Sequence, residues 1–204
     1  MKLRYISEKK FPPFLDSIHR LKPSDLPIDA TARIFCQHCG LWNRAILCPP
    51  LLYKTYPQYR TLESSRRYFS EFKRIYLYVF KNDGSKAWWF HGDKRFFHLT
   101  PKKGKGRQLK GCETSSAREL TVIMRKIRRA NEKLGHLVEC FIQGHCDLCG
   151  RKCPNRENPP CERGGLASLE STGINVYKLL DQLGVEYEYP VINYLTQVTM
   201  MAVV

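Results

Sequence analysis

The spacing of apolar side chains predicts three amphipathic helices. Apolar residues recur every three or four positions, the period of a helix with one buried face, in residues 59–73, 116–134 and about 168–183. The second of these carries further signals. Ser116 and Glu119 have the spacing of a capping box, and Gly135 stands where a C-terminal cap belongs.

Other segments are short and rich in β-branched and aromatic residues, which is typical of strands. These are residues 74–80, 88–91, 96–99, 136–142, 185–189 and 191–198. Helices that alternate with strands predict an α/β fold, a single layered domain over residues 1–204 with cysteine-rich metal-binding loops. No internal repeat or low-complexity linker divides the chain, and the pattern does not give the order of the strands.

Composition narrows the class of protein. A hydrophobic fraction of 43% and an aromatic fraction of 12% exclude a wholly disordered chain. The N-terminus has no apolar run of signal-peptide length, and the apolar-rich residues 191–204 are shorter than the ~20 needed to span a bilayer. We therefore expect a cytoplasmic protein without a membrane partner, in a compartment where thiols stay reduced. Nine cysteines, an odd number, also fit poorly with a closed disulfide framework.

A group of four cysteines near the C-terminus is the strongest chemical signal. Cys146, Cys149, Cys153 and Cys161 are spaced C-x2-C-x3-C-x7-C. Thiolates this close in sequence can converge on one corner of a [4Fe–4S] cluster. A structural zinc site more often uses two separated C-x2-C pairs, so zinc is the alternative cofactor.

A second group has three cysteines, Cys36, Cys39 and Cys48, spaced C-x2-C-x8-C. Three interpretations stay open for it. A fourth ligand comes from elsewhere in the chain, the metal keeps an open position, or Cys36 and Cys39 form a knuckle that is completed by members of the other group. The sequence therefore predicts one or two clusters. The candidates for the fourth ligand are Cys112, Cys140 and His38.

The remaining candidates differ in their surroundings. Cys140 alternates with buried-type residues in a predicted strand, so core packing is the expected role. Cys112 is expected at the start of a helix, where the pKa of a thiol falls, and is the better extra ligand or reactive group. His38 and His145 stand beside cysteines, where supporting hydrogen bonds or exposure are commoner than ligation.

Taken together, these motifs resemble a known family. The chain has Cys-x2-Cys, Trp42 and Cys48-Pro49-Pro50, then the C-terminal cysteines, then a segment Ser168-Leu169-Glu170-x2-Gly173-Ile174-x-Val176. This order resembles the predicted metal-binding protein family catalogued as domain of unknown function 2284, over a core of about residues 36–183. The resemblance implies a cytoplasmic protein that binds iron–sulfur clusters, with no settled reaction. Two positions depart from the family pattern: Cys161 is followed by Glu162-Arg163-Gly164 instead of Arg-x-Pro, and Asn175 replaces an aspartate.

The charge of the chain suggests a competing function. The formal net charge is +15, and the segment 102–133, within a predicted basic loop and helix at 101–135, holds eleven basic and three acidic residues. Such a segment could follow a phosphate backbone, or face an acidic protein. The alternative hypothesis is therefore a zinc-stabilised module that binds RNA or another nucleic acid.

The leading hypothesis is an iron–sulfur protein that transfers electrons, with a redox partner protein, or supports cluster-dependent redox chemistry. No catalytic triad, P-loop, dinucleotide-binding turn or radical-SAM cysteine spacing is present in the sequence. We therefore assign no catalytic residue and leave open whether the protein is an enzyme. The sequence gives no oligomeric state.

Overall fold

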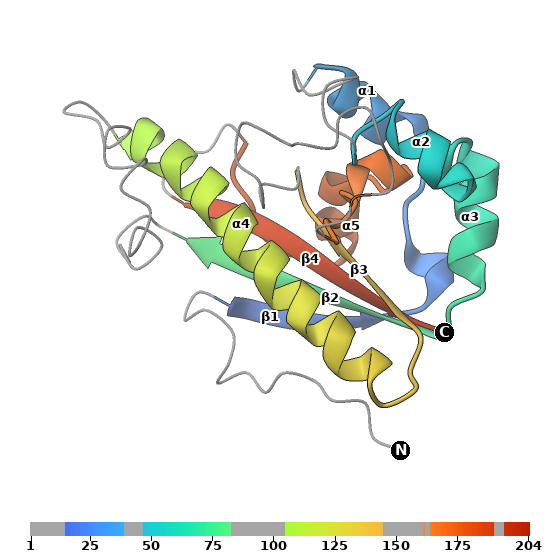
Figure 1. Ribbon diagram of the computed structural model, residues 1–204. Helices are drawn as coiled ribbons and strands as arrows, with labels where there is room; N and C mark the ends of the chain where they lie inside the picture. The colour runs from blue at the N-terminus through green and yellow to red at the C-terminus, as the bar shows by residue number, and fades with distance from the viewer. Residues whose placement is uncertain (1–14, 39–46, 83–104, 145–160, 162–163, 190–193) are drawn as a thin grey trace.

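The computed structural model is built on a four-stranded antiparallel sheet in the order β1-β2-β4-β3 (Figure 1). It describes residues 15–38, 47–82, 105–144, 161, 164–189 and 194–204, with residues 82 and 105–116 described for their backbone alone. The strands are β1 Leu15–Leu21, β2 Arg74–Asn82, β3 Val138–Ile142 and β4 Leu195–Val203. The helices are α1 Ala30–His38, α2 Leu52–Thr55, α3 Leu62–Ser70, α4 Lys105–Glu132 and α5 Val176–Gln182, with 3-10 turns η2 Pro23–Asp25, η3 Pro57–Tyr59 and η6 Glu170–Thr172.

The two central strands are buried on both faces. In β2, Ile75, Leu77 and Val79 enter one core while the tyrosines and phenylalanine between them enter the other. All nine residues of β4 are buried. A strand covered on both sides reads as a continuous apolar run, which explains why the sequence pattern of both strands was easily recognised.

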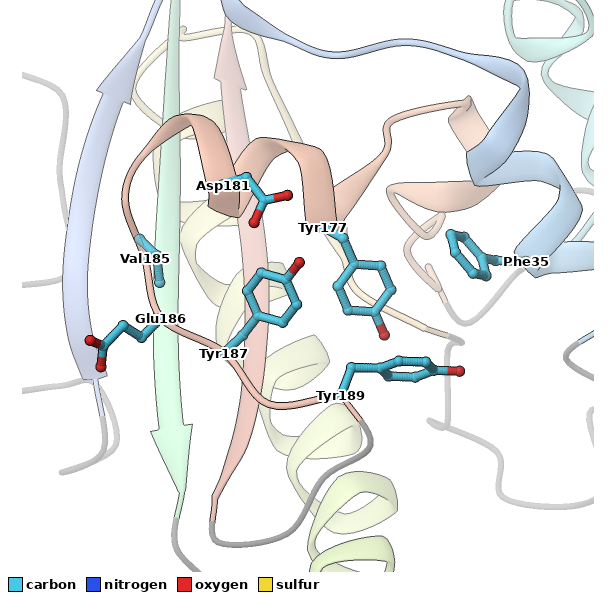
Figure 2. Close-up of a pocket in the computed structure, with 7 residues that line it drawn as sticks. All are labelled: Phe35, Tyr177, Asp181, Val185, Glu186, Tyr187 and Tyr189. Atoms are coloured by element: carbon cyan, nitrogen blue, oxygen red, sulfur yellow. The ribbon is translucent and has the colours of Figure 1, made fainter.

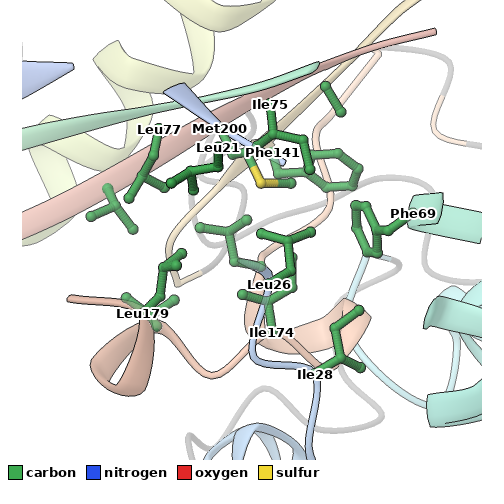
Figure 3. Close-up of a cluster of buried hydrophobic side chains, with 14 of the residues drawn as sticks. Leu21, Leu26, Ile28, Phe69, Ile75, Leu77, Phe141, Ile174, Leu179 and Met200 are labelled. Atoms are coloured by element: carbon green, nitrogen blue, oxygen red, sulfur yellow. The ribbon is translucent and has the colours of Figure 1, made fainter. Parts of the chain in front are cut away.

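The sheet separates two hydrophobic cores. The first core lies between the sheet and the short elements η2, α2, α3 and α5, where Leu26, Phe69 and Leu179 meet Leu77 and Met200 (Figure 3). The second core lies under α4, which crosses the other face with Leu120, Met124 and Ile127 turned inward (Figure 1). The fold is therefore a three-layer arrangement of mixed α/β class, as the sequence predicts.

The long helix differs from its prediction at one end. It ends as expected, because Gly135 adopts a left-handed conformation and its N–H donates to the carbonyl of Glu132 at 3.0 Å. The predicted start of the helix was wrong. The helix begins at Lys105, so Ser116 lies in its interior and not at the N-cap position, and residues 105–107 belong to the helix instead of a loop. Gly106 and Gly111 each cost about 1 kcal/mol relative to alanine. Lysine, arginine, glutamine and leucine around them still favour propagation of the helix.

Two predictions near the C-terminus also need correction. The stretch 168–183 is not one helix, because Gly173 has φ +95° and separates η6 from α5. Residues 185–189 form no strand and return irregularly along α5 (Figure 2). Their alternation of apolar and acidic side chains imitates a strand, but Tyr187 and Tyr189 contact Tyr177 of α5 instead of a sheet.

The other predicted elements are confirmed with shifted bounds or lie outside the described residues. Helix 59–73 becomes η3 and α3, because Thr61 caps α3 through its Oγ1, which accepts the N–H of Ser64 at 3.0 Å. Strands 74–80 and 136–142 are found as β2 and β3, and 191–198 is found later as β4. The segments 88–91 and 96–99 are outside the described residues. In the described part of the chain, no helix has the length and apolar character to cross a membrane.

Candidate metal centre

The two ends of the C-terminal cysteine segment lie together. Residues 145–160, which carry Cys146, Cys149 and Cys153, are outside the described part, but the chain on both sides of them is described. The N–H of Ile142 donates to the carbonyl of Ala167 at 3.2 Å, and the N–H of Leu169 donates back to the carbonyl of Ile142 at 2.8 Å. The segment therefore leaves β3 and returns beside it as a closed loop.

Glu170 fixes the point at which this loop departs. Its carboxylate Oε2 accepts the backbone N–H of Gly144 at 3.2 Å. Gly144 has φ +77°, a conformation that favours glycine, and it directs the chain out of β3. A charged acceptor on a peptide N–H makes a stronger hydrogen bond than a neutral one. The glutamate of the family motif thus anchors the base of the cysteine loop.

Cys161 lies in a tight turn at the other end of the loop. Its Sγ accepts the N–H of Gly165 at 3.4 Å, and its carbonyl accepts the N–H of Gly164 at 2.9 Å. Its side chain is half-buried against the first core. Backbone N–H groups directed at a cysteine sulfur are among the interactions that tune iron–sulfur centres. This turn therefore suits a thiolate ligand.

Cys36 is positioned by the anchoring of α1. Asp29 caps this helix, because its Oδ1 accepts the N–H of Thr31 at 2.9 Å. One turn before the cysteine, the guanidinium of Arg33 donates to the carbonyls of Arg60 at 2.8 Å and Tyr59 at 2.7 Å. These bonds tie α1 to the start of α3, and Cys36 on the same side of the helix is buried.

Cys48 is also buried and leads directly into α2. Its carbonyl accepts the N–H of Leu52, the first residue of α2, at 3.0 Å. Leu52 is fully buried in the first core, so the helix that follows Cys48 is fixed to the body of the protein. Both described members of the N-terminal group therefore have rigid neighbours.

Two tyrosines, Tyr53 in α2 and Tyr56 directly after it, pack against the first core. Burial raises the pKa of Tyr53, the Arg33 guanidinium lowers it, and the charge of Cys36 raises it. The pKa of Tyr56 is also raised by burial first, with a further increase from the charge of Cys161. The hydroxyl of Tyr53 donates to the carbonyl of Ser171 at 3.4 Å, which ties α2 to η6. This bond fixes α2, which follows Cys48, to η6, which follows the C-terminal cysteine segment.

Two other cysteines lie in β3 and α4, Cys140 in the strand and Cys112 in the helix. Cys140 is packed in the second core, on the α4 side of the sheet, which confirms the expected core role. Burial raises the pKa of its thiol, so the neutral form is favoured there. The prediction for Cys112 assumed that this residue stands at the start of a helix. That was wrong, because Cys112 lies inside α4, which starts at Lys105. The argument for a pKa lowered by a helix N-terminus therefore does not apply to it.

The described residues alone do not assemble a complete metal site. Within them, no group of three or more histidine, cysteine, aspartate or glutamate side chains could hold a metal ion. Cys36, Cys48 and Cys161 are described, whereas the other predicted ligands and His145 lie outside the described part: Cys39, Cys146, Cys149 and Cys153. Of the histidines, His38 is exposed at the end of α1, where its Nδ1 lies 2.8 Å from the carbonyl of Ile34. The sequence predictions for these ligands stay predictions.

Sequence analysis missed a polar cluster next to Tyr56. Glu139 of β3 accepts hydrogen bonds from the hydroxyls of Tyr59, at 2.9 Å, and Tyr68. Burial and the Glu139 carboxylate raise the pKa of both phenols. The sequence does hold a signal for this cluster: Glu139 is a carboxylate within an otherwise apolar strand, and a charge shielded from water needs hydrogen-bond partners.

Comparison with known proteins identifies one family. Residues 19–204 match the family model described as predicted metal-binding protein, domain of unknown function 2284. Neither the curated proteins nor the solved structures gave a match to the chain.

Proposed function

The chain belongs to the predicted metal-binding protein family, and we propose that it holds a [4Fe–4S] cluster on its C-terminal cysteines. The proposed ligands are Cys146, Cys149, Cys153 and Cys161. The observation that carries this proposal is the turn at Cys161, where a backbone N–H points at the sulfur. A cluster held there would supply one-electron transfer, for which a redox partner protein is the expected partner.

The closed loop supports convergence of these four ligands. Because the chain leaves and returns at hydrogen-bonded positions beside β3, the three cysteines between Gly144 and Cys161 belong to a loop with fixed ends. Fixed ends reduce the conformational entropy that ligand assembly must overcome. The short spacings between these cysteines favour a cubane corner over two separate zinc knuckles.

The N-terminal group is proposed as a second metal site near α2. Cys36 in α1 and Cys48 shortly before α2 are buried, and Cys39 follows three positions after Cys36 in sequence. Cys140 is an unsuitable fourth ligand, because it packs in the second core. His38 is better suited, since hydrogen bonding of its Nδ1 to a backbone carbonyl leaves Nε2 as the basic nitrogen. Cys112 and an open metal position remain the other interpretations.

Metal analysis after anaerobic purification tests this proposal. About four iron and four sulfide per chain, with a broad absorption band, would establish one cluster. About eight of each would make both cysteine groups cluster sites. Stoichiometric zinc without iron or sulfide would contradict the redox proposal.

The zinc outcome would favour the alternative function, a nucleic-acid-binding module. One observation supports it: α4 is a 28-residue helix, and Lys126 and Arg129 are exposed on it. The charge of Arg128 is partly balanced, because its Nε lies 2.8 Å from Glu132 Oε1. Alanine at Lys102, Lys103, Lys105 and Arg107 should then abolish retention of RNA and flatten its salt dependence. Unchanged retention would remove this alternative.

A further inference from the structure

An open pocket lies beside α5, at the edge of the first core, against which its lining residues Val185 and Tyr187 pack. It has a volume of about 650 Å³, within the range of small-molecule sites. Its walls come from α1, α5 and the irregular segment 185–189 (Figure 2). The lining residues are Phe35, Tyr177, Asp181, Val185, Glu186, Tyr187 and Tyr189.

The aromatic rings of the pocket are grouped around Tyr177. Phe35 meets it edge-on with ring centroids 5.6 Å apart, Tyr187 lies at 5.2 Å and Tyr189 at 5.4 Å. Figure 2 shows that these rings come from three parts of the chain: α1, α5 and the segment 185–189. Phe35 is 41% exposed and Tyr189 is 71% exposed, so two of the large apolar side chains exposed in the described residues belong to this one pocket. Exposed aromatic groups gathered at a cavity indicate a binding surface.

The local chain geometry explains why the rings meet. Gly184, with φ +63°, ends α5, and the N–H of Val185 donates to the carbonyl of Leu180 at 3.0 Å. The chain therefore reverses, and Tyr187 and Tyr189 return to the helix beside Tyr177. This reversal is also why the period-two pattern of 185–189 produces a pocket wall instead of a strand.

The charge of the pocket is opposite to that of the whole protein. Asp181 and Glu186 are its ionisable carboxylates, and none of its seven lining residues is lysine, arginine or histidine. The nearest basic side chain on α5, Lys178, instead lies 3.9 Å from Asp29. The Asp181 carboxylate accepts the hydroxyl of Tyr187; burial and this hydrogen bond raise the pKa of the phenol. Two negative charges on a protein of net charge +15 make this pocket a local exception.

We propose that this pocket binds a small organic cation with a methylated or quaternary ammonium group. Such a cation is attracted to the faces of tyrosine and phenylalanine rings and to the Asp181 carboxylate beside Tyr187, while the Glu186 carboxylate points away from the rings and adds only a longer-range attraction (Figure 2). A small anion would face the two carboxylates without a basic partner among the lining residues. None of the seven lining residues is a proposed metal ligand, although Phe35 precedes Cys36 in sequence.

Ligand-observed NMR titration with choline on the full chain tests the proposal. The control ligand is dimethylbutanol, in which a carbon replaces the quaternary nitrogen of choline. We expect choline to bind about tenfold more tightly than this uncharged analogue, because cation–π and carboxylate attraction act on charge and not on shape. Equal affinities, or no binding of choline, would overturn the proposal.

Variants distinguish the contribution of the aromatic rings to choline binding from that of the carboxylates. The exposed Tyr189 should tolerate substitution, so Tyr189→Ala is expected to weaken choline binding several-fold while Tyr189→Phe retains it. The double variant Asp181→Asn with Glu186→Gln should weaken binding about tenfold. The matched control is Glu63→Gln, an exposed carboxylate on α3, which should bind choline like the parent. Unchanged binding in the double variant would contradict the proposal.

Metal content is measured on the same samples. Loss of choline binding with normal metal content would overturn only the pocket. Choline binding by a protein without iron would contradict only the proposed cluster.

Discussion

The two faces of the sheet are covered in different ways. On one face, α4 supplies a single continuous helix of 28 residues, and the cysteine beneath it, Cys140, is part of the core. On the other face, several short elements cover the sheet; Cys36 lies near the end of α1, Cys48 lies shortly before α2, and Cys161 lies in a turn between elements. A long helix has few chain ends, whereas short elements expose N–H and carbonyl groups at many turns. Sites that need directed backbone groups are therefore easier to build on the second face.

Cys140 and Cys161 show how the two faces provide different surroundings for the same type of residue. The Cys140 thiol is surrounded by apolar side chains, and burial raises its pKa. Cys161 is less buried and receives a backbone N–H in a turn of two glycines. Thiolates are the form that binds metal, so the second environment suits a ligand and the first does not.

The largest effect should come from opening a cavity under α4. Met124 is fully buried in the second core, and Met124→Ala should lower the free energy of unfolding by about 3 kcal/mol. Because this face is assigned no ligand, metal content per folded chain should not change. Guanidinium unfolding and metal analysis measure the two quantities. The exposed Lys126→Ala is the control and should change stability by less than about 0.5 kcal/mol. Metal loss in folded Met124→Ala would break the distinction between the faces.

Two glycines compare the faces directly. Both Gly135 after α4 and Gly173 before α5 have positive φ, but a Cβ on Gly135 would meet open space. A Cβ on Gly173 would lie 3.0 Å from Leu62 Cδ2 and 3.3 Å from Ile28 Cγ2. We expect Gly135→Ala to cost about 1 kcal/mol, for the backbone alone, and Gly173→Ala about 2–3 kcal/mol. Equal losses in thermal or chemical unfolding would show that the short elements are not closely packed at this junction.

Asn175 links the caps of two helices on the short-element face. Its Oδ1 accepts the N–H of Lys178 at 3.1 Å, and its Nδ2 donates to the Asp29 carboxylate at 3.3 Å. The aspartate of the family pattern would place two carboxylates in contact here. Asn175→Asp should therefore destabilise the protein by about 1 kcal/mol, although it keeps the cap. The loss should shrink in high salt, whereas the uncharged Asn175→Ser should show no such salt dependence. A salt-independent loss would exclude repulsion as its cause.

An effect of similar size is expected at Tyr59, whose hydroxyl donates to Glu139. Burial, followed by the Glu139 charge, raises the pKa of Tyr59. Because the folded-state pKa is raised, this contribution to stability is fully present below the unfolded pKa of about 10 and falls as the pH rises above it. Tyr59→Phe should cost about 1 kcal/mol near neutral pH and show a flatter decline above pH about 10. Parallel pH profiles of the two proteins would contradict this account.

The sequence was most informative where burial is continuous. The apolar runs of β2 and β4 and the stripe of α4 were recognised because one period dominates each of them. The edge strand β1 was missed, since polar residues occupy both of its faces: Asp16 and Arg20 are exposed together with Ile18, whereas Ser17 and His19 lie on the half-buried face. The break at Gly173 was missed as well, because the apolar residues on both sides keep a helical spacing while the backbone reverses.

The candidate site was less accessible to sequence reasoning. Spacing identified the cysteines, but it could not show what anchors the segments that carry Cys36 and Cys161, because that depends on contacts between distant elements. The anchoring residues Arg33, Glu170 and Glu139 carry no local pattern that reveals their partners. The aromatic pocket was not predicted, because the segment 185–189, which forms one of its walls, has the alternating sequence pattern of a strand.

A paired comparison of Cys161→Ser and Cys140→Ser tests the central claim most directly. Iron, zinc and sulfide per chain are measured after identical anaerobic purification, together with circular dichroism to confirm folding. We predict that Cys161→Ser loses the metal of the C-terminal group, while Cys140→Ser keeps the full parental content. Parental metal content in Cys161→Ser, or metal loss in folded Cys140→Ser, would contradict the assignment of the metal centre to the face of short elements.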